Sequence, residues 1–352
     1  MSSVTLAHVA ERAGVTVPTA SKVINGRSDV SPATRARVLA AVAETGYRGK
    51  RPPVPRDDES ALVDLVISGV EGTWANRALS GVELAANLAG RDVVVTVSRP
   101  AADRDWAERL VARRSSGAVV ALVEPTAEQY AALAVARIPL VILDPRSEPP
   151  EGIASVGAGN WAGGRAAAEH LLTLGHRHIG LIDGEPNHLY GQARVDGFSS
   201  VLREHGVELQ DRDRVHADWG FVGALPAAMT LLDRPDRPTA VFACSDPMAL
   251  GALEAARRLR IRVPEDLSVL GFDDAPEARW TSPQLTTIRQ PVVEMGAAAL
   301  RMLLRVWAGA DASVGDGLAP REELATRLVV RGSTAPPSTT NESRRIAKGG
   351  SS

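Results

Sequence analysis

Several carboxylates stand at the ends of short apolar runs, where a parallel sheet would present them to a ligand. These aspartates are Asp144, Asp183, Asp246, Asp273 and Asp274. In open αβ sheets, ligands bind beyond the carboxyl ends of the strands. Carboxylates accept hydrogen bonds from hydroxyl groups, an arginine donates several, and a tryptophan face stacks on the apolar face of a sugar ring. The pattern therefore predicts a site for a small molecule rich in hydroxyl groups, such as a sugar.

A second group of residues near the N-terminus has the chemistry to read DNA. Two short helices are expected on either side of Gly14, with Thr5 and Thr16 as their caps and Pro18 in the first turn of the second. This arrangement is typical of a helix-turn-helix, whose second helix lies in the major groove. A small helical bundle without a nucleic-acid role is the alternative.

The second helix, 17–24, is expected to turn Ala20, Val23 and Ile24 inward. Its outward side chains would then meet the DNA. Lys22 can donate to a guanine edge, while Val17 and Pro18 can contact thymine methyl groups. Thr19 and Ser21 can bind phosphate or base. A third helix is expected to open at Ser31 and to run to about Thr45.

The distribution of charge agrees with a nucleic-acid-binding head. Residues 1–56 contain nine Lys or Arg and three Asp or Glu, a balance of +6, whereas the whole chain carries −2. The remainder therefore carries −8. A basic head on an acidic body is the electrostatic pattern expected of a small DNA-binding module joined to a second function.

The elements that must position the strand-end aspartates form a regular alternation. Apolar runs of strand character occur at 62–68, 92–98, 117–123, 139–144, 178–183, 239–246 and 267–274. Helical patterns occur between and after them at 76–89, 103–114, 127–136, 161–174, 192–205, 247–259 and 292–308. Such an alternation indicates parallel sheets buried on both faces. The predicted fold class is α/β, with a helix-turn-helix head and two doubly wound αβ lobes.

The expected domain boundaries follow changes in composition. We expect a DNA-binding domain at 1–48, a proline- and arginine-rich linker at 49–60, an effector-binding domain at 61–334 and a disordered tail at 335–352. Lobe 1 would comprise about 61–160 and 290–320, and lobe 2 about 161–289 and 321–334. No apolar stretch is long enough for a membrane span and none forms a leader, so a cytoplasmic protein is expected.

The head follows a long pattern, V-T-L-x-x-V-A-x-x-A-G-V-S-x-x-T-V-S-x-V-[IL]-N. The matching residues are Val4, Thr5, Leu6, Val9, Ala10, Ala13, Gly14, Val15, Thr19, Ser21, Val23 and Asn25. This segment resembles the DNA-binding head of the lactose/galactose repressor family of bacterial transcription regulators. The expected DNA contacts are Thr5, Thr16, Val17, Pro18, Thr19, Ser21, Lys22, Asn25, Ser31, Thr34, Arg48 and Arg51.

The body is similar to the same family over roughly residues 61–333. Matching stretches are NWAGGRAAAEHLLTLGHRHIG from Asn160, ARVDGF around Arg194, SDPMALG from Ser245, VPEDLSVLGFDD from Val263 and PQLTTIRQP at 283–291. The resemblance implies a periplasmic-binding-protein type of fold, with the ligand between two lobes and the chain crossing three times. It carries effector contacts over to Trp74, Asp144, Arg194, Trp219, Asp246 and Asp273.

One stretch departs from the family. Members usually continue into a hinge helix that inserts leucines into the minor groove, whereas Pro52, Pro53 and Pro55 occupy that place here. Proline removes donors and keeps the preceding residue from helical angles. The hypothesis for this chain is a basic arm along the DNA, which would include Arg48, Lys50, Arg51 and Arg56.

Other chemistry is weighed and set aside. The glycines at 157–163 follow a strand, but the spacing of a dinucleotide fingerprint is missed by one residue. His170, His176 and His178 lack a partner at metal-ligand spacing, Ser245 lacks the frame of a nucleophile elbow, and Cys244 is the only cysteine. We expect no cofactor, no metal and no enzyme activity.

The leading expectation is thus a transcription repressor that binds a palindromic double-stranded operator as a homodimer, because one helix-turn-helix covers only half a site. A small-molecule effector, expected to be a sugar, would control it, and no membrane is involved. The alternatives are a sugar-binding receptor without a DNA role and, third, an enzyme built on the αβ body.

Overall fold

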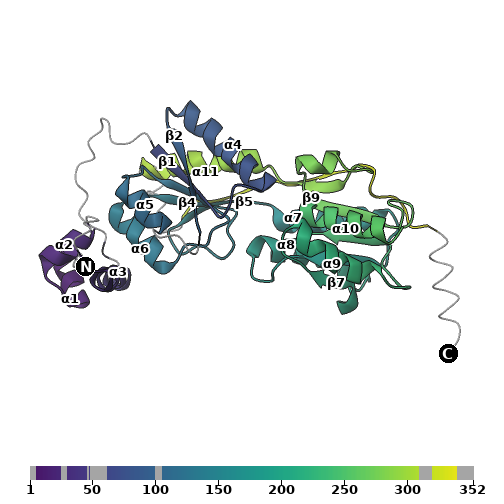
Figure 1. Ribbon diagram of the computed structural model, residues 1–352, viewed down its shortest axis with the longest axis horizontal. Helices are drawn as coiled ribbons and strands as arrows, with labels where there is room; N and C mark the ends of the chain where they lie inside the picture. Colours follow the sequence, from purple (N-terminus) through teal and green to yellow (C-terminus); the bar gives the residue numbers. More distant parts are fainter. Residues whose placement is uncertain are drawn as a thin grey trace. The chain divides into compact units, whose positions relative to one another are not determined.

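The computed structural model of this chain describes residues 5–24, 30–45, 47, 62–99, 105–308 and 319–338 (Figure 1). The chain divides into two compact units. Unit 1 comprises 1–145, 149–156 and 293–322, and unit 2 comprises 146–148, 157–292 and 323–352. Within the described residues, none of the helices combines the length and the apolar character that crossing a bilayer requires.

Unit 1 begins with the three helices expected of the head. They are α1 (Leu6–Ala13), α2 (Val17–Ile24) and α3 (Pro32–Thr45). Their inner faces share one small core of buried residues, Val9, Ala10, Ala13, Ala20, Val23, Val38, Ala41 and Val42. The cap residues and the inward apolar positions therefore predicted the three helices of the head, and the bounds of the second helix agree with the prediction.

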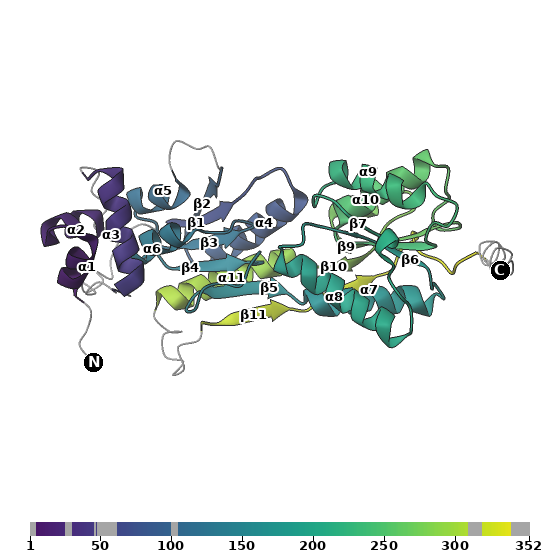
Figure 2. The ribbon, with the colours of Figure 1, turned by 90° about the horizontal axis from the view of Figure 1, so that it is seen from below.

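The rest of unit 1 is a six-stranded sheet covered by helices, and its strands β1, β3, β4 and β5 lie as neighbours in Figure 2. The strands are β1 (Leu62–Ile67), β2 (Asp92–Val97), β3 (Ala118–Ala121), β4 (Leu140–Leu143), β5 (Ala154–Ala158) and β11 (Arg321–Leu324), in the order β11-β5-β4-β3-β1-β2. Strands β2, β1, β3, β4 and β5 run parallel. The helices are α4 (Thr73–Leu88), α5 (Trp106–Ala112), α6 (Ala127–Ala136) and α11 (Val292–Trp307).

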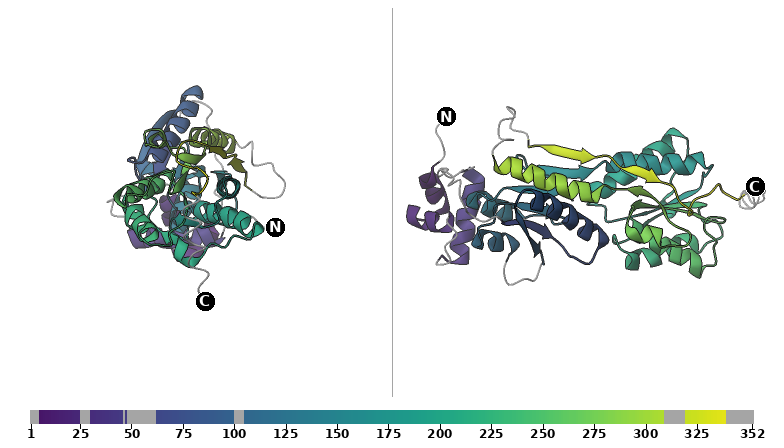
Figure 3. Two further views of the ribbon diagram at one scale, coloured as in Figure 1. Left: turned by 90° about the vertical axis from the view of Figure 1, so that its right-hand side faces the viewer. Right: turned by 90° about the horizontal axis from the view of Figure 1, so that it is seen from above.

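Glycines bring two of these helices together. A Cβ on Gly81 of α4 would lie 1.9 Å from the carbonyl oxygen of Val293, and one on Gly296 of α11 would lie 2.5 Å from that of Ala78. The right-hand view of Figure 3 shows α11 alongside α4. Both positions need glycine because no side chain fits at so close a backbone approach.

Unit 2 repeats the layered design. Its strands are β6 (Ile179–Asp183), β7 (Arg214–His216), β8 (Ala240–Ala243), β9 (Ser268–Asp273), β10 (Thr286–Arg289) and β12 (Arg327–Val329), in the order β12-β10-β9-β8-β6-β7. Only the pairing of β12 with β10 is antiparallel among those described for this sheet. The helices are α7 (Asn160–Thr173), α8 (Leu189–Glu204), α9 (Phe221–Leu232) and α10 (Asp246–Arg258), with 3₁₀ turns at η1 (Asp211–Asp213) and η2 (Pro276–Arg279).

The α/β class and the two sheets are as predicted, and each of the seven apolar runs contains a strand. Strands β5, β7, β10, β11 and β12 and helix α9 were not among the expected elements. The three C-terminal strands are three or four residues long and rich in Thr, Arg and Glu, so they give no apolar run. Helix α9 contains Pro226, a residue that ordinarily argues against a helix interior.

The disordered tail was expected to begin at residue 335, but residue 335 is ordered in the structure. Ser268 Oγ accepts a hydrogen bond from the Ala335 backbone N–H at 3.0 Å and donates to its carbonyl at 2.9 Å. Residue 335 is therefore held against β9 rather than disordered. The expectation for 339–352 lies outside the described residues.

Candidate nucleic-acid interface and ligand-binding cluster

The turn between α1 and α2 depends on Gly14. Its φ is +63°, in the left-handed region that favours glycine. There the Gly14 N–H donates to the Glu11 carbonyl at 3.1 Å, and the Val15 N–H donates to the Ala10 carbonyl at 3.0 Å, which satisfies the last carbonyls of α1. The turn thus fixes the direction in which α2 leaves.

Helix α2 starts at a threonine cap. The Thr16 hydroxyl accepts from the Thr19 backbone N–H at 3.4 Å, and the two threonine hydroxyls lie 2.9 Å apart. Pro18 lies in the first turn, where no N–H is needed. Ser31 caps α3 in the same way, accepting from the Thr34 N–H at 3.3 Å. At α1 the bond differs, because the Thr5 N–H donates to Nδ1 of His8 at 3.1 Å.

One side of α2 is exposed. Val17 is 44% exposed, and Pro18 and Lys22 are exposed with it. We call Val17, Pro18 and Lys22 the recognition face. The outward residues Thr19 and Ser21 are half-buried, and Ile24, expected inside, is half-buried rather than fully buried.

The remaining residues that were expected to contact DNA lie near α2 or outside the residues that the structure describes. Thr5, Thr16 and Ser31 are exposed, and Thr34 is half-buried. All four are at helix starts, where free backbone N–H groups also attract phosphate. Asn25, Arg48 and Arg51, and the proline-rich linker, lie outside the described residues, so their expected roles stay predictions.

Arg194 is the centre of a polar and aromatic group in unit 2. It lies on α8 and is 2% exposed. Its Nε donates to Oδ1 of Asn160 at 2.8 Å and its Nη1 donates to the carbonyl of Cys244 at 2.6 Å. Its carbon Cζ lies 3.9 Å from the centre of the Phe272 ring. Two hydrogen bonds and one ring thus hold the guanidinium in a single orientation.

The position of Arg194 depends on close helix packing. A Cβ on Gly164 of α7 would lie 2.0 Å from the Arg194 carbonyl oxygen, and one on Gly197 of α8 would lie 2.0 Å from that of Trp161. Only glycine allows the two helices to approach this closely. Asn160, the first residue of α7, is thereby brought to the arginine.

Trp219 is held beside Arg194 by three kinds of contact. Its Nε1–H donates to Nδ1 of His188 at 2.7 Å. Its ring lies 4.9 Å from that of Tyr190, and a Cβ on Gly184 would lie 2.2 Å from it. The Arg194 guanidinium carbon is 5.7 Å from the indole centre, within the range of a cation–π contact.

Asp273 ends β9 next to this arginine. Its Oδ1 lies 3.7 Å from Nη1 of Arg194, and its φ is +121°. A non-glycine residue at such an angle is strained and persists only where its surroundings hold it. We call Asn160, His188, Tyr190, Arg194, Trp219 and Asp273 the ligand cluster. It presents one charge of each sign, ring faces and amide or imidazole groups, the chemistry that suits hydroxyl groups on a carbon ring.

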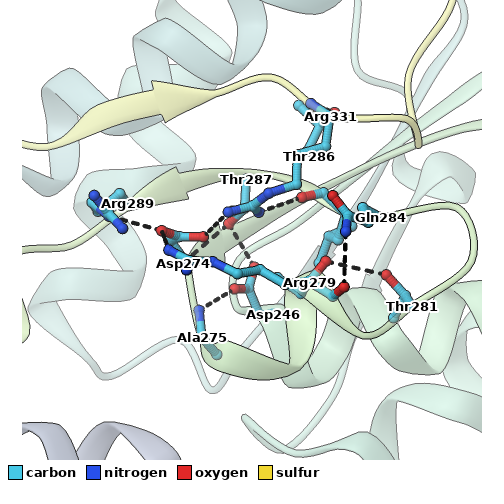
Figure 4. A network of polar contacts seen from close by, with 12 residues as sticks. Asp246, Asp274, Ala275, Arg279, Thr281, Gln284, Thr286, Thr287, Arg289 and Arg331 are labelled. Carbon is cyan, nitrogen blue, oxygen red and sulfur yellow. Dashed lines mark hydrogen bonds and ion pairs between the residues drawn. The ribbon is translucent and has the colours of Figure 1, made fainter.

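Asp246 is engaged within the protein. It is fully buried, its Oδ2 accepts from the Ala275 N–H at 2.7 Å and its Oδ1 accepts from the Thr287 hydroxyl at 2.6 Å (Figure 4). Burial and, secondly, the charge of Asp273 raise the pKa of the Asp246 carboxyl. The Asp246 side chain therefore links three elements. These are helix α10, the turn that follows β9, and strand β10.

Asp274, next to Asp273, joins the same network from the other side. Its carboxylate pairs with Arg289 at 2.7 Å and with Arg331. Burial by itself would raise the pKa of the Asp274 carboxyl, but the two guanidinium groups outweigh it and lower that pKa. Figure 4 shows the carboxylate between them. Arg289 lies on β10 and Arg331 follows β12, so Asp274 ties β10 and the segment after β12 to the end of β9.

Two expected effector contacts belong to unit 1, apart from the ligand cluster of unit 2. Asp144 is 3% exposed, follows β4 with φ +52°, and donates its N–H to Val156 at 2.7 Å. Trp74 is half-buried in the first turn of α4. Arg194, Trp219 and Asp273 are thus the three expected residues that the structure brings together.

The side chains that were set aside have contacts inside the chain. Nδ1 of His176 lies 2.9 Å from the Thr239 hydroxyl, His170 contacts Thr334 and His178 contacts Asp213. Ser245 caps α10 by accepting from the Met248 N–H. The strand-end carboxylate Asp183 pairs with Arg214 and with His216. These contacts account for each residue as part of the unit 2 scaffold.

Sequence reasoning did not single out His188, Tyr190 or Asn160. One signal was present, because Tyr190 and Arg194 are four residues apart and share a helix face. Asn160 opens a helix within the glycine stretch that was weighed only as a phosphate loop. No sequence pattern points to His188. It stands just before α8, and only the folded chain brings its ring to Trp219.

The comparisons with known proteins agree with both parts. Residues 5–49 match the family of bacterial regulatory proteins of the lacI family, and residues 168–334 match a periplasmic binding protein-like domain. The HTH-type transcriptional regulator MalR of Streptomyces coelicolor is 34% identical over 94% of this chain and 96% of its own length. The HTH-type transcriptional repressor PurR of Serratia proteamaculans is 33% identical over 85% and 89%. This chain therefore belongs to the lacI family of bacterial regulatory proteins.

Solved structures show the same architecture. The complex of the transcriptional regulator CelR with cellobiose has a TM-score of 0.71 and 32% identity, covering 94% of this chain and 99% of CelR. A lac repressor dimer bound to operator and the anti-inducer ONPF has a TM-score of 0.69 and 29% identity, covering 95% and 100%. The expected fold class, a helix-turn-helix head with two αβ lobes, is confirmed.

Proposed function

We propose that this chain is a transcription repressor that binds operator DNA as a homodimer and is controlled by a sugar bound at the ligand cluster. It acts by binding rather than by catalysis, and it works in the cytoplasm, where operator DNA is found. The observation that carries the proposal is the presence, in one chain, of an exposed recognition face on α2 and of a buried arginine held among aromatic rings and a carboxylate. The first feature serves DNA and the second serves a small polar ligand.

The DNA part rests on the construction of α2. The Gly14 turn and the Thr16 cap fix the helix, while Ala20 and Val23 anchor one side in the core. Val17, Pro18 and Lys22 are left on the other side, where they can reach base edges in a major groove. Thr19 and Ser21, half-buried on the same helix, are proposed to contact phosphate.

The effector part rests on the chemistry of the ligand cluster. Arg194 offers a fixed guanidinium, Asp273 offers acceptors and Trp219 offers a ring. The charges of Arg194 and Asp273 balance, which favours an uncharged ligand over an acid or an amine. CelR, a relative of similar structure, was solved with cellobiose. By the resemblance to the family, Trp74, Asp144 and Asp246 also remain proposed effector contacts.

The dimer is supported by exposed apolar side chains. Leu84 and Leu88, one turn apart on α4, are 53% and 81% exposed. In unit 2, Val222 and Trp280 are 81% and 75% exposed. Leu84 and Leu88 share one face of α4, and adjoining exposed apolar side chains, unlike single ones, mark surfaces to which a partner binds. A second copy is the partner that a palindromic operator requires.

A gel mobility-shift experiment tests the function. The full chain is mixed at one fixed salt concentration with a duplex taken from the region beside its own gene, with and without cellobiose and other neutral sugars. Retardation that depends on the duplex sequence and changes with a sugar is the expected result. Sugar binding in a calorimeter without retardation of any duplex would instead favour a sugar receptor without a DNA role.

A further inference from the structure

His188 lies where three side chains of unit 2 converge. Its Nδ1 accepts from Trp219 Nε1 at 2.7 Å and lies 3.1 Å from the Tyr190 hydroxyl. Its Nε2 faces Nε of Arg146 at 2.9 Å. The imidazole is 5% exposed, so water contributes little to its hydrogen bonding. This ring therefore determines how Trp219 and Arg146 are held.

The direction of these hydrogen bonds restricts the protonation of the ring. An indole N–H and a guanidinium only donate, whereas an uncharged imidazole carries a lone pair on one nitrogen and a hydrogen on the other, so the ring can accept from only one of them. A doubly protonated imidazole has no lone pair, and it would turn N–H groups toward Trp219 and Arg146. The bond from Trp219 therefore needs the uncharged ring, with the lone pair on Nδ1 and the hydrogen on Nε2.

The charges around His188 act in the same direction. Arg146 and, behind Tyr190 and Trp219, Arg194 are positive. Glu185 is the carboxylate on this side, with Oε2 3.6 Å from Nε2, but its side chain is 61% exposed and water screens it. Tyr190 is a further titratable neighbour, with its hydroxyl 3.1 Å from Nδ1.

Trp219 has no other hydrogen-bonding atom with which to fix its ring. Glycines 184 and 191 bring backbone against the indole, at 2.2 Å and 2.7 Å from a notional Cβ, which restrains the ring but not its tilt. The bond to His188 supplies that restraint. If it is lost, the indole keeps its packing contacts but loses the directional restraint on its orientation beside Arg194.

We propose that uncharged His188 positions Trp219 for the ligand, and that this makes ligand affinity, but not DNA affinity, fall on acidification. The inference rests on the proposed function for the identity of the ligand as a neutral sugar. His188 is a positioning residue, since it acts through the indole.

The first experiment uses the full chain without any ligand. The fluorescence of Trp219 is isolated by subtracting the spectrum of a Trp219→Phe variant and is followed from about pH 8 to about pH 4.5, a range that extends below the ordinary histidine titration because the surroundings of His188 disfavour the charged ring. We expect the emission to change with pH in the wild type and in the exposed control His205→Gln, and to stay constant in His188→Gln. A flat wild-type profile, or an unaltered one in His188→Gln, would overturn the proposal.

The second experiment measures cellobiose binding by calorimetry. His188→Leu removes the acceptor and should weaken binding about tenfold, the scale of one lost hydrogen bond in a buried site. His188→Gln keeps an acceptor oxygen and should stay within about threefold while losing the pH dependence. Wild-type affinity in His188→Leu would refute the positioning role. Failure of the proposed function shows separately, as absence of DNA retardation or of sugar binding by the wild type.

Discussion

Gln290 holds Asp273 by both its side chain and its backbone. The Gln290 Nε2 donates to Oδ1 of Asp273 at 3.1 Å, and its backbone N–H donates to the Asp273 carbonyl at 3.3 Å. Asp273 has a strained φ of +121°, so it needs such support. Gln290 follows β10 and stands two residues before Val292, the last residue of unit 2 before the chain enters unit 1. Gln290 thereby joins a proposed ligand contact, Asp273, to the segment in which the chain passes from unit 2 to unit 1.

Replacing Gln290 by alanine should weaken sugar binding. The Asp273 carboxylate loses a donor and part of its fixed orientation, at a cost of about 1 kcal/mol or roughly fivefold in affinity. Calorimetry with cellobiose measures the change. The control is Gln284→Ala, an exposed glutamine whose amide donates to the Arg279 carbonyl away from Asp273. Equal affinities for the two variants would show that the Gln290 amide does not support the site.

Replacing Arg194 by lysine should impair both binding and stability. A lysine keeps the charge but cannot donate to Asn160 and Cys244 in the fixed fork of a guanidinium. We expect sugar affinity to fall by more than about tenfold, and the free energy of unfolding to fall by about 2 kcal/mol because buried acceptors are left unpaired. Calorimetry and urea unfolding measure the two effects. Arg203→Lys, exposed on the same helix, should change neither.

The fold could be predicted from sequence where burial on both faces leaves an apolar run. Strands β1, β3, β4, β6, β8 and β9 are such cases, and the alternation with helices gave the α/β class. Short strands at the sheet edges could not be predicted. The pairing of β10 with β12, for example, joins Thr287 to Val329, two residues far apart in the chain, and no local pattern records such a contact.

The candidate site was predictable only in part. Arg194 and Asp273 were named through the family pattern, and Asp273 also through its place at a strand end. The roles of His188 and Asn160 come from contacts between elements that are distant in sequence, such as α7 against α8. Asp246 illustrates the opposite case. An aspartate after a strand looks the same in the sequence whether it faces a ligand or accepts hydrogen bonds inside the protein. Asp246 accepts such bonds from the Ala275 N–H and the Thr287 hydroxyl.

Replacing Lys22 by alanine should reduce the discrimination between operator and other DNA. Lys22 is exposed on the recognition face, and a lysine contact to a guanine edge contributes roughly 1–3 kcal/mol. Fluorescence anisotropy on operator and scrambled duplexes at one salt concentration measures the specificity ratio. Arg37→Ala, an exposed charge on α3, serves as the control. An equal loss on both duplexes would assign Lys22 to the phosphate backbone instead.

The stability of unit 2 should fall on mild acidification because of His176. Burial lowers the pKa of His176 from 6.5 to about 4, while Thr239 and Ala335 hold the ring. Between these values the unfolded chain binds the proton and the folded one does not, so stability is fully present above about pH 6.5 and falls toward pH 4. The effect reaches about 3 kcal/mol. Urea unfolding at pH 7 and 4.5 measures it.

The variant His176→Gln separates this residue from the other titrating groups. Its neutral amide cannot take up the proton, so the difference in unfolding free energy between the two pH values should shrink by most of that amount. His205→Gln, exposed at the end of α8, should leave the difference as in the wild type. If His176→Gln also leaves it unchanged, the acid sensitivity belongs to other groups.

Replacing Leu88 by glutamate should weaken the dimer. Leu88 is 81% exposed on α4 and would be covered by a second copy, so a charge there would be buried without a partner when the copies associate. The head of a monomer covers only half of a palindromic site, and operator affinity should therefore fall as well. Sedimentation velocity over a concentration series measures the dissociation constant, which should rise at least about tenfold, the equivalent of 1.4 kcal/mol.

Glu83→Gln, on the same helix and exposed, is the matched control and should sediment as the wild type does. An unaltered dimer in Leu88→Glu, together with normal operator binding, would place the contact between copies elsewhere, with the exposed Val222 and Trp280 of unit 2 as the next surface to test.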